Sequence, residues 1–209
     1  MIKIRSKKVE AIISEIIDQY AYADKSDRPW IIGFSGGKDS TVLLTLVWIA
    51  LQRIKQDLPY PFQLRRPVYV VCNDTMVENP IISSYIDDVL VKIEEGARDQ
   101  GIPIIVKKTV PKLEESFWIN VIGKGYPVPN NTFRWCTDKL SKHNTNANTY
   151  VYAPIKELML EEIWYIINTV SSPWGFDNSI LFQIYADASA DDYECPTVVT
   201  NKTHSSCRQ

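Results

Sequence analysis

The sequence contains no run of about 18 or more apolar residues, the length that a membrane-spanning helix requires, and no signal-peptide core follows its basic N-terminus. It also has little net charge, because 23 Lys and Arg residues are matched by 25 Asp and Glu residues. Affinity for nucleic acid depends on clustered Lys and Arg, so a net charge of -2 gives no global attraction to DNA. We therefore expect a cytoplasmic protein without membrane contact, in which DNA binding needs a local basic patch or a helper protein.

Cysteine and histidine are scarce. The four cysteines stand at positions 72, 136, 195 and 207, and no two have Cys-x-x-Cys spacing, so a complete zinc or iron-sulfur signature is absent. Because the sequence has no secretory features, we interpret these cysteines as thiols or metal ligands rather than disulfides. Cys72 ends an apolar run and is better explained as a core residue. The two histidines are isolated and receive no catalytic assignment.

The apolar content is sufficient for one globular domain, since the chain has 209 residues and 45% of them are hydrophobic. Short apolar runs predict strands at residues 30–34, 68–72 and 103–106, and the apolar stretch 41–50 predicts a buried helix. Asn79 followed by Pro80 predicts the start of a helix that reaches about Gln100. This alternation is typical of a parallel sheet with helices on both faces.

Beyond this region the pattern is weaker. Residues 113–122 favour a helix, residues 123–131 favour a loop, and a short strand at 151–153 precedes a helix over about 156–169. Near the N-terminus, apolar positions 9, 12, 13, 16 and 17 predict an amphipathic helix. We treat residues 1–209 as a single domain, in which residues 190–209 begin a cysteine-bearing C-terminal segment.

The first predicted strand is followed by a polar glycine loop, made of Ser35, Gly36, Gly37, Lys38, Asp39 and Ser40. Glycines let the backbone approach a ligand closely, and the helix that follows offers its unpaired N–H groups and the positive end of its dipole. Lys38 adds a positive charge, and the two serines add hydroxyl groups. The loop is therefore predicted to bind a polyphosphate.

The loop is not a Walker A motif, because Lys38 is followed by Asp39 and no glycine stands five residues before Gly37. Its order instead resembles the PP-loop of the ATP pyrophosphatases, a superfamily that includes adenylylsulfate reductases, tRNA thiolation enzymes and glutamine-dependent synthetases. The resemblance implies an open, mostly parallel five-stranded α/β sheet with helices on both faces, of the adenine nucleotide alpha hydrolase type. It also implies ATP cleavage between the α and β phosphates. Asp39 could hold Mg²⁺ against these phosphates, and the alternative is an ordinary glycine turn.

A second polar group follows the second predicted strand. Asp74 and Thr75 come directly after the run that ends at Cys72 and Asn73. In open parallel sheets, ligands bind outside the carboxyl ends of the strands, so these two residues are expected near the nucleotide or its acceptor. Turn chemistry and helix capping explain the same residues equally well.

Four further segments resemble the DndC family, the PP-loop component of bacterial DNA phosphorothioation systems, which is similar to phosphoadenylylsulfate reductases. They are DTMVENP at 74–80, SFWINVIGKGYP at 116–127, FRWCTD at 133–138 and YAPI at 152–155. The likeness extends over roughly residues 30–207. It implies replacement of a non-bridging oxygen of a DNA backbone phosphate by sulfur. The implied partners are DNA, a cysteine desulfurase as sulfur donor and other proteins of the system.

The resemblance gives several residues a role in this chemistry. Transfer of AMP onto a phosphate oxygen turns a poor leaving group into a good one, and Lys38 with the loop N–H groups would stabilise the charge that develops. Arg134 could hold the acceptor phosphate, with a surface salt bridge as the equal alternative. Cys136 is interpreted as a thiol that handles sulfur or as a substitute cluster ligand, although an inert buried cysteine fits as well.

The C-terminal cysteines match the family in part. In the family a cysteine-rich C-terminal segment carries an iron-sulfur cluster, and Cys195 and Cys207 match its first two cysteines. A four-iron cluster needs four thiolates, and the Gly-Cys-Trp-x-Cys continuation of the family is absent here. We therefore expect a 4Fe-4S cluster whose ligands are completed by a longer native chain. Residues 141–149 replace a strand and an arginine-bearing loop of the family, and we expect additional native residues there too.

Two other functions are compatible with the same residues. A phosphoadenylylsulfate reductase-like enzyme acting on a small molecule would share the fold, and substrate trials separate it from the DNA-modifying enzyme. A non-catalytic subunit that binds ATP would share the loop but release neither pyrophosphate nor AMP. Analysis of the products of ATP turnover distinguishes these possibilities.

Overall fold

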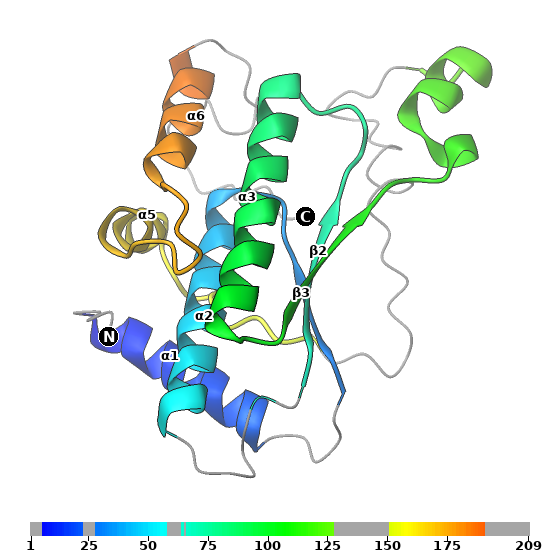
Figure 1. Cartoon of the computed structure of the whole chain (residues 1–209). Helices are drawn as coiled ribbons and strands as arrows, with labels where there is room; N and C mark the ends of the chain where they lie inside the picture. Colours follow the sequence, from blue (N-terminus) through cyan, green and yellow to red (C-terminus); the bar gives the residue numbers. More distant parts are fainter. Residues whose placement is uncertain (1–5, 23–27, 58–63, 65, 128–150, 191–209) are drawn as a thin grey trace.

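A computed structural model describes residues 6–22, 28–57, 64, 66–127 and 151–190 of the chain (Figure 1). Helices and strands alternate through the first half, and helices alone follow. The elements in chain order are α1 (Lys7–Ala21), β1 (Trp30–Gly33), α2 (Lys38–Asp57), β2 (Val68–Asn73), α3 (Pro80–Gln100), β3 (Ile104–Thr109), η1 (Leu113–Glu115), η2 (Ile119–Gly123), α5 (Leu160–Thr169) and α6 (Ser179–Ala190).

The described strands form one parallel sheet of three strands in the order β1-β2-β3. Trp30 pairs with Val68, and Val68 pairs with Ile104, so the three strands begin at the same level. The α/β class and the parallel pairing agree with the sequence. The prediction of five strands is wrong for the part of the chain that the structure describes.

The smaller number of strands has a physical reason in the segment 151–153. It was predicted as a strand, but no strand pairs with it, Val151 is 83% exposed, and Pro154 follows directly. Three residues that end at a proline offer too few backbone N–H groups for a stable ladder. The number five came from the family resemblance rather than from five apolar runs, and residues 128–150 and 191–209 lie outside the described residues.

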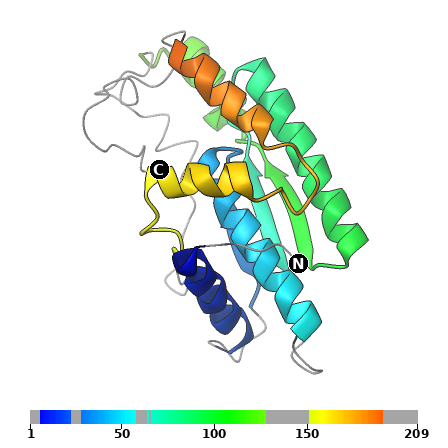
Figure 2. The same ribbon diagram turned by 90° about the vertical axis from the view of Figure 1, so that its left-hand side faces the viewer.

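Helices α2 and α3 lie on the same side of the sheet (Figure 2). This follows from two successive right-handed crossovers in one direction, β1 to β2 and β2 to β3. On the opposite side of the sheet Ile31 is 70% exposed and Ile105 is 38% exposed. The prediction of helices on both faces is therefore wrong within the described ranges.

The core lies between the covered face of the sheet and the helices. Helix α2 forms its centre, because its residues are buried almost all round, including Trp48 at 0% exposure, as the apolar stretch 41–50 predicted. Helix α1 packs its apolar stripe, including Ile13 and Ile16, against α2. The bidentate pair of Arg53 with Glu10 joins the same two helices at 2.7 and 3.0 Å.

One helical boundary needed correction, and one helix was not predicted. Residues 113–122, predicted to be helical, form a 3₁₀ turn, η1, and a π-helical turn, η2, at the far end of β3. Helix α5 begins at Leu160 rather than near Lys156. Helix α6 was not predicted. By contrast, α3 has the predicted bounds: Asn79 accepts from Ile81 N at 2.9 Å, and Gly101 ends the helix with a left-handed conformation.

Candidate functional site

The glycine loop connects the carboxyl end of β1 to α2. Phe34 extends the ladder past β1, since its N–H donates to Val71 O at 2.8 Å, and α2 begins four residues later at Lys38. Parallel pairing of β1 with β2 puts the end of β2, where Asp74 follows Asn73, at the same edge of the sheet. Both predicted ligand-binding segments therefore share the carboxyl edge.

The local geometry requires glycine at position 36 and leaves little room for a side chain at position 37. Gly36 has φ of +74°, and a Cβ there would lie 2.8 Å from Ile86 Cγ1 on α3. A Cβ at Gly37 would lie 3.2 Å from Tyr185 Oη and 3.4 Å from Ser35 Oγ. The space above Gly37 is therefore lined by hydroxyl groups, and any side chain at that position would fill it. This is the geometry expected of a loop that a phosphate approaches closely.

The serine hydroxyls hold the loop against the first turn of α2. Ser40 Oγ donates to Gly37 O at 3.0 Å and accepts from Ser35 N at 3.3 Å. Ser35 Oγ accepts from Gly37 N at 3.4 Å and lies 3.3 Å from Ser40 Oγ. Several of these contacts are long, so a phosphate oxygen can replace them at little cost. At the start of α2, Thr41 N donates to Gly37 O at 3.0 Å, and Lys38 N makes only the long bond of 3.5 Å to Tyr185 Oη, which an anion could replace.

Lys38 and Asp39 supply the charges of the loop. Lys38 Nζ lies 3.3 Å from Asp39 Oδ2, and the side chain of Asp39 is 57% exposed while that of Lys38 is 23% exposed. The exposed carboxylate is accessible to a divalent cation that accompanies a polyphosphate. The Lys38 ammonium is held closer to the loop, because it also lies 5.3 Å from the centre of the Tyr185 ring.

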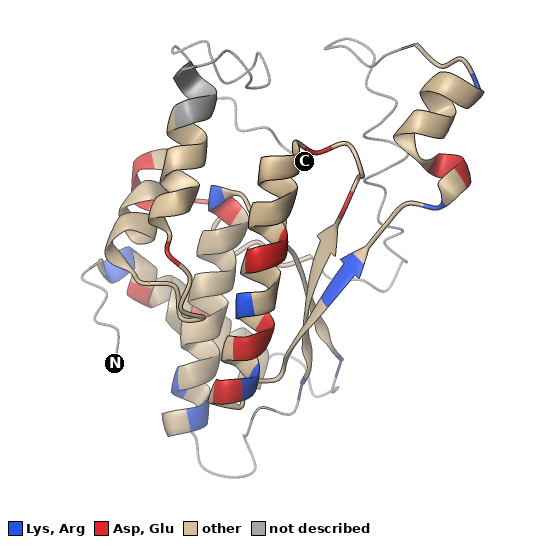
Figure 3. Cartoon of the chain, turned by 45° about the horizontal axis from the view of Figure 1, so that its top comes forward, with Lys and Arg blue, Asp and Glu red and all other residues tan. Residues whose placement is uncertain are grey.

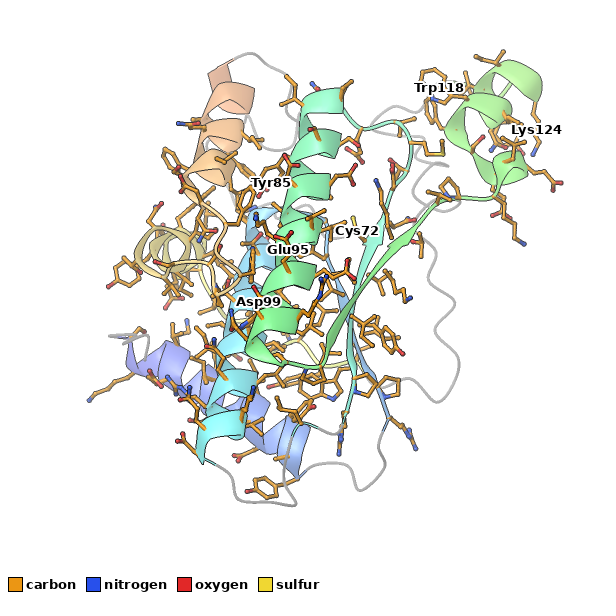
Figure 4. All side chains as sticks on the ribbon, viewed as in Figure 1. Cys72, Tyr85, Glu95, Asp99, Trp118 and Lys124 are labelled. Carbon is orange, nitrogen blue, oxygen red and sulfur yellow. The ribbon has the colours of Figure 1, made fainter. Side chains whose placement is uncertain are left out.

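Two tyrosines that were not predicted as site residues also contact the loop. Tyr85 of α3 donates to Gly36 O at 3.4 Å, and its ring packs edge-on against Phe176 (Figure 4). Tyr185 of α6 accepts from Lys38 N at 3.5 Å. Burial, together with the neighbouring Tyr185, raises the pKa of Tyr85 to about 12. Tyr85 is therefore neutral and serves as a hydrogen-bond donor at physiological pH.

The segment after β2 is built around Asp74. Its carboxylate accepts from Met76 N at 2.8 Å and lies 3.0 Å from Lys108 Nζ, which also contacts Asp87 of α3 at 2.7 Å. Burial opposes ionisation of Asp74, but the Met76 N–H and the Lys108 ammonium outweigh it and lower the pKa of the carboxyl. Thr75 donates to Glu78 at 3.0 Å. Both predicted residues thus organise this turn, and their described side-chain contacts are with Met76, Glu78 and Lys108 rather than with the glycine loop.

The predicted cysteine chemistry is not tested by the described part of the chain. Cys72 is buried in the core, as expected, and burial raises the pKa of its thiol. Arg134, Cys136, Cys195 and Cys207 lie outside the described residues. Within the described ranges no group of three or more His, Cys, Asp and Glu side chains is arranged to hold a metal ion.

The distribution of positive charge on the surface bears on how the chain could bind DNA. Lys and Arg residues are spread over α1, α2, α3 and β3 rather than gathered on one element (Figure 3).

An exposed indole, Trp118, lies on the η1–η2 projection near Lys124, and its Nε1 donates to Met76 O at 3.3 Å (Figure 4). In the ranges that the structure covers, every helix is too short or too polar to cross a bilayer.

No family model and no solved structure matches the chain. A curated relative is an uncharacterized protein of Methanocaldococcus jannaschii, which is 31% identical over 115 residues. The aligned region covers 55% of this chain and 18% of that protein, so the chain spans less than a fifth of the relative. This likeness names no activity, and the candidate site must be interpreted from its own residues.

Proposed function

We propose that this chain is an ATP pyrophosphatase of the PP-loop type, which cleaves ATP to AMP and pyrophosphate in order to activate a backbone phosphate of DNA for sulfur incorporation. The observation that carries the proposal is the glycine loop between β1 and α2. It combines a left-handed Gly36, a closely surrounded Gly37, two serine hydroxyls and Lys38 at the start of a 20-residue helix.

The loop residues suit the β and γ phosphates of ATP. The N–H groups at the start of α2, the Ser35 and Ser40 hydroxyls and the Lys38 ammonium are donors of the kind that stabilise pyrophosphate as it leaves. The exposed carboxylate of Asp39 would hold Mg²⁺ against the phosphates, and its accessibility supports this role. In this step an acceptor phosphate oxygen bonds to the α phosphorus, and the bond from that phosphorus to the bridging oxygen breaks.

The second step of the proposed reaction is the one that the resemblance to the DndC family implies. A sulfur nucleophile attacks the adenylylated backbone phosphorus, and AMP leaves with the oxygen that it received. A cysteine desulfurase would supply the sulfur as a persulfide, and a thiol reductant would break the S–S bond to release it at the oxidation level of sulfide. Arg134 would hold the acceptor phosphate, and Cys136 would handle the sulfur. Cys195 and Cys207 would be two ligands of the 4Fe-4S cluster. Because Lys and Arg are dispersed over the described elements, we propose that partner proteins of the system contribute to DNA binding.

The decisive experiment is product analysis of ATP turnover by the full-length protein with Mg²⁺, DNA and its partners. AMP and pyrophosphate are the expected products, whereas ADP and phosphate would overturn the assignment. ATP binding without any release would instead favour a non-catalytic subunit. Mass spectrometry of nuclease-digested DNA then measures incorporated sulfur. Reduction of an adenylylated sulfate with no sulfur in DNA would favour the small-molecule reductase.

Variants of the loop connect this activity to its residues. Lys38→Ala and Asp39→Ala are each expected to abolish most pyrophosphate release while circular dichroism stays unchanged, because both residues lie outside the core. Lys92→Ala is the matched control, since Lys92 is an exposed lysine of α3 paired only with Glu95. Near-normal release in either loop variant would remove that residue from the proposed machinery.

A further inference from the structure

Helix α6 brings a side chain directly onto the glycine loop. Tyr185 Oη accepts from the backbone N–H of Lys38 at 3.5 Å and lies 3.2 Å from the position of a Cβ built on Gly37. The ring of the same tyrosine lies 5.3 Å from Lys38 Nζ, a cation–π contact. One residue of α6 thus contacts both the backbone donor and the charged side chain that a phosphate would use.

Packing against α5 and the anchored start of α6 hold Tyr185 in this position. Its ring packs edge-on against Trp164 of α5 at 5.2 Å, and Phe182, on the preceding turn of α6, packs against the same indole at 5.6 Å. The start of α6 is held by Asn178, which donates to Ile167 O and Val170 O at 3.1 and 3.2 Å. Tyr185 is therefore presented to the loop by a supported helix and not by a loose segment.

The contacts that Tyr185 makes with the loop are weaker than those that a phosphate would make. A hydrogen bond of 3.5 Å from a neutral N–H to a neutral hydroxyl is near the limit of the interaction, whereas a phosphate oxygen accepts a shorter, charge-assisted bond. The cation–π contact with Lys38 is likewise weaker than a direct ion pair with phosphate. A polyphosphate that uses these two donors must displace the Tyr185 hydroxyl from Lys38 N.

We propose that Tyr185 is a residue of the polyphosphate site that occupies the acceptor position over Lys38 in the ligand-free loop and thereby lowers the affinity for ATP. The proposal rests on the proposed function, because it assumes that the loop binds polyphosphate. Removing the hydroxyl while keeping the ring frees the Lys38 N–H but preserves the packing against Trp164. The expected gain is about 2-fold in ATP affinity, the low end of the value of a neutral hydrogen bond, because the contact is long.

The test is equilibrium binding of ATP and of inorganic tripolyphosphate to the full-length protein and to Tyr185→Phe, with Tyr165→Phe as the matched control. Tyr165 is half-exposed on α5, away from the loop, and loses the same oxygen. Both probes should bind more tightly to Tyr185→Phe, mainly through faster association, and equally to Tyr165→Phe. Lys38→Ala verifies that the signal comes from the loop, because it should weaken both probes.

The outcomes separate this inference from the function on which it rests. If the unmodified protein binds both probes and Lys38→Ala weakens them, but Tyr185→Phe binds equally or less well, the role of Tyr185 is wrong and the polyphosphate loop stands. If the unmodified protein binds neither probe, both proposals are overturned. Circular dichroism and thermal melting of Tyr185→Phe should match those of the unmodified protein, which excludes a change in folding as the cause of altered affinity.

Discussion

Replacement of Gly36 by alanine tests whether the loop has the left-handed conformation on which the site depends. At φ of +74° an L-residue suffers a clash between its Cβ and the backbone, which costs about 1–2 kcal/mol. The added methyl group also meets Ile86 Cγ1 at 2.8 Å, too close for a real contact, so α3 or the loop must shift. Overpacking of this kind typically costs about 1–3 kcal/mol. The total destabilisation expected is about 2–5 kcal/mol.

Thermal and urea unfolding measure this loss, since a change of 1 kcal/mol shifts the midpoint by about 2–4 °C for a chain of this size. Gly33→Ala is the matched control, because no atom lies within 4 Å of its built Cβ and its φ is not positive. It should change the free energy of unfolding by less than about 0.5 kcal/mol. Ile86→Ala in the Gly36→Ala background should restore the stability that is lost to overpacking, but not the stability that is lost to the strained backbone. A double-mutant cycle measures this coupling between the two positions. Equal stability of Gly36→Ala and Gly33→Ala would refute the described loop geometry.

Two further predictions concern the framework around the site. Tyr20→Phe should lower the free energy of unfolding in urea by about 1–3 kcal/mol, because Tyr20 Oη donates to Arg66 O at 2.7 Å and accepts from Arg66 N at 3.2 Å in a buried place, and both groups would lose this partner; an unchanged midpoint would contradict it. The lowered pKa of Asp74 stabilises the fold above the unfolded value near pH 4, and this stability is lost as pH falls through the folded pKa. Asp74→Asn should therefore flatten the dependence of stability on pH below about 4, and an unaltered acid transition would show that Asp74 ionises without consequence for folding.

Much of the first half of the fold could be predicted from local patterns. The strands and the helix that begins after Asn79 were found because short apolar runs, a polar cap and a closing Gly101 are signals contained within a few residues. The strand count could not be found in this way. It was taken from a resemblance, and the one extra run available, at 151–153, is too short and too exposed to pair.

The candidate site was predicted only as far as the motif itself extends. The glycine loop between a strand and a helix follows from the order of its residues, but the helix was predicted from Thr41 and begins at Lys38, and the left-handed conformation of Gly36 was not predicted. Tyr85 and Tyr185 could not be assigned, because their approach to the loop depends on the packing of α3 and α6. The apolar residues Leu181, Ile184 and Tyr185 do have helical spacing, and this signal could have located α6.

The order β1-β2-β3 gives the described sheet two unpaired edges, and they are unlike. Strand β3 carries Lys107 and Lys108, and charged side chains of this kind discourage the addition of another strand. Strand β1 has no charged residue, and its Ile31 is largely exposed. Its row of backbone N–H and C=O groups is the better template, so growth of the sheet is directed to the β1 edge. In a partly folded chain the same edge is where two copies would associate and begin to aggregate.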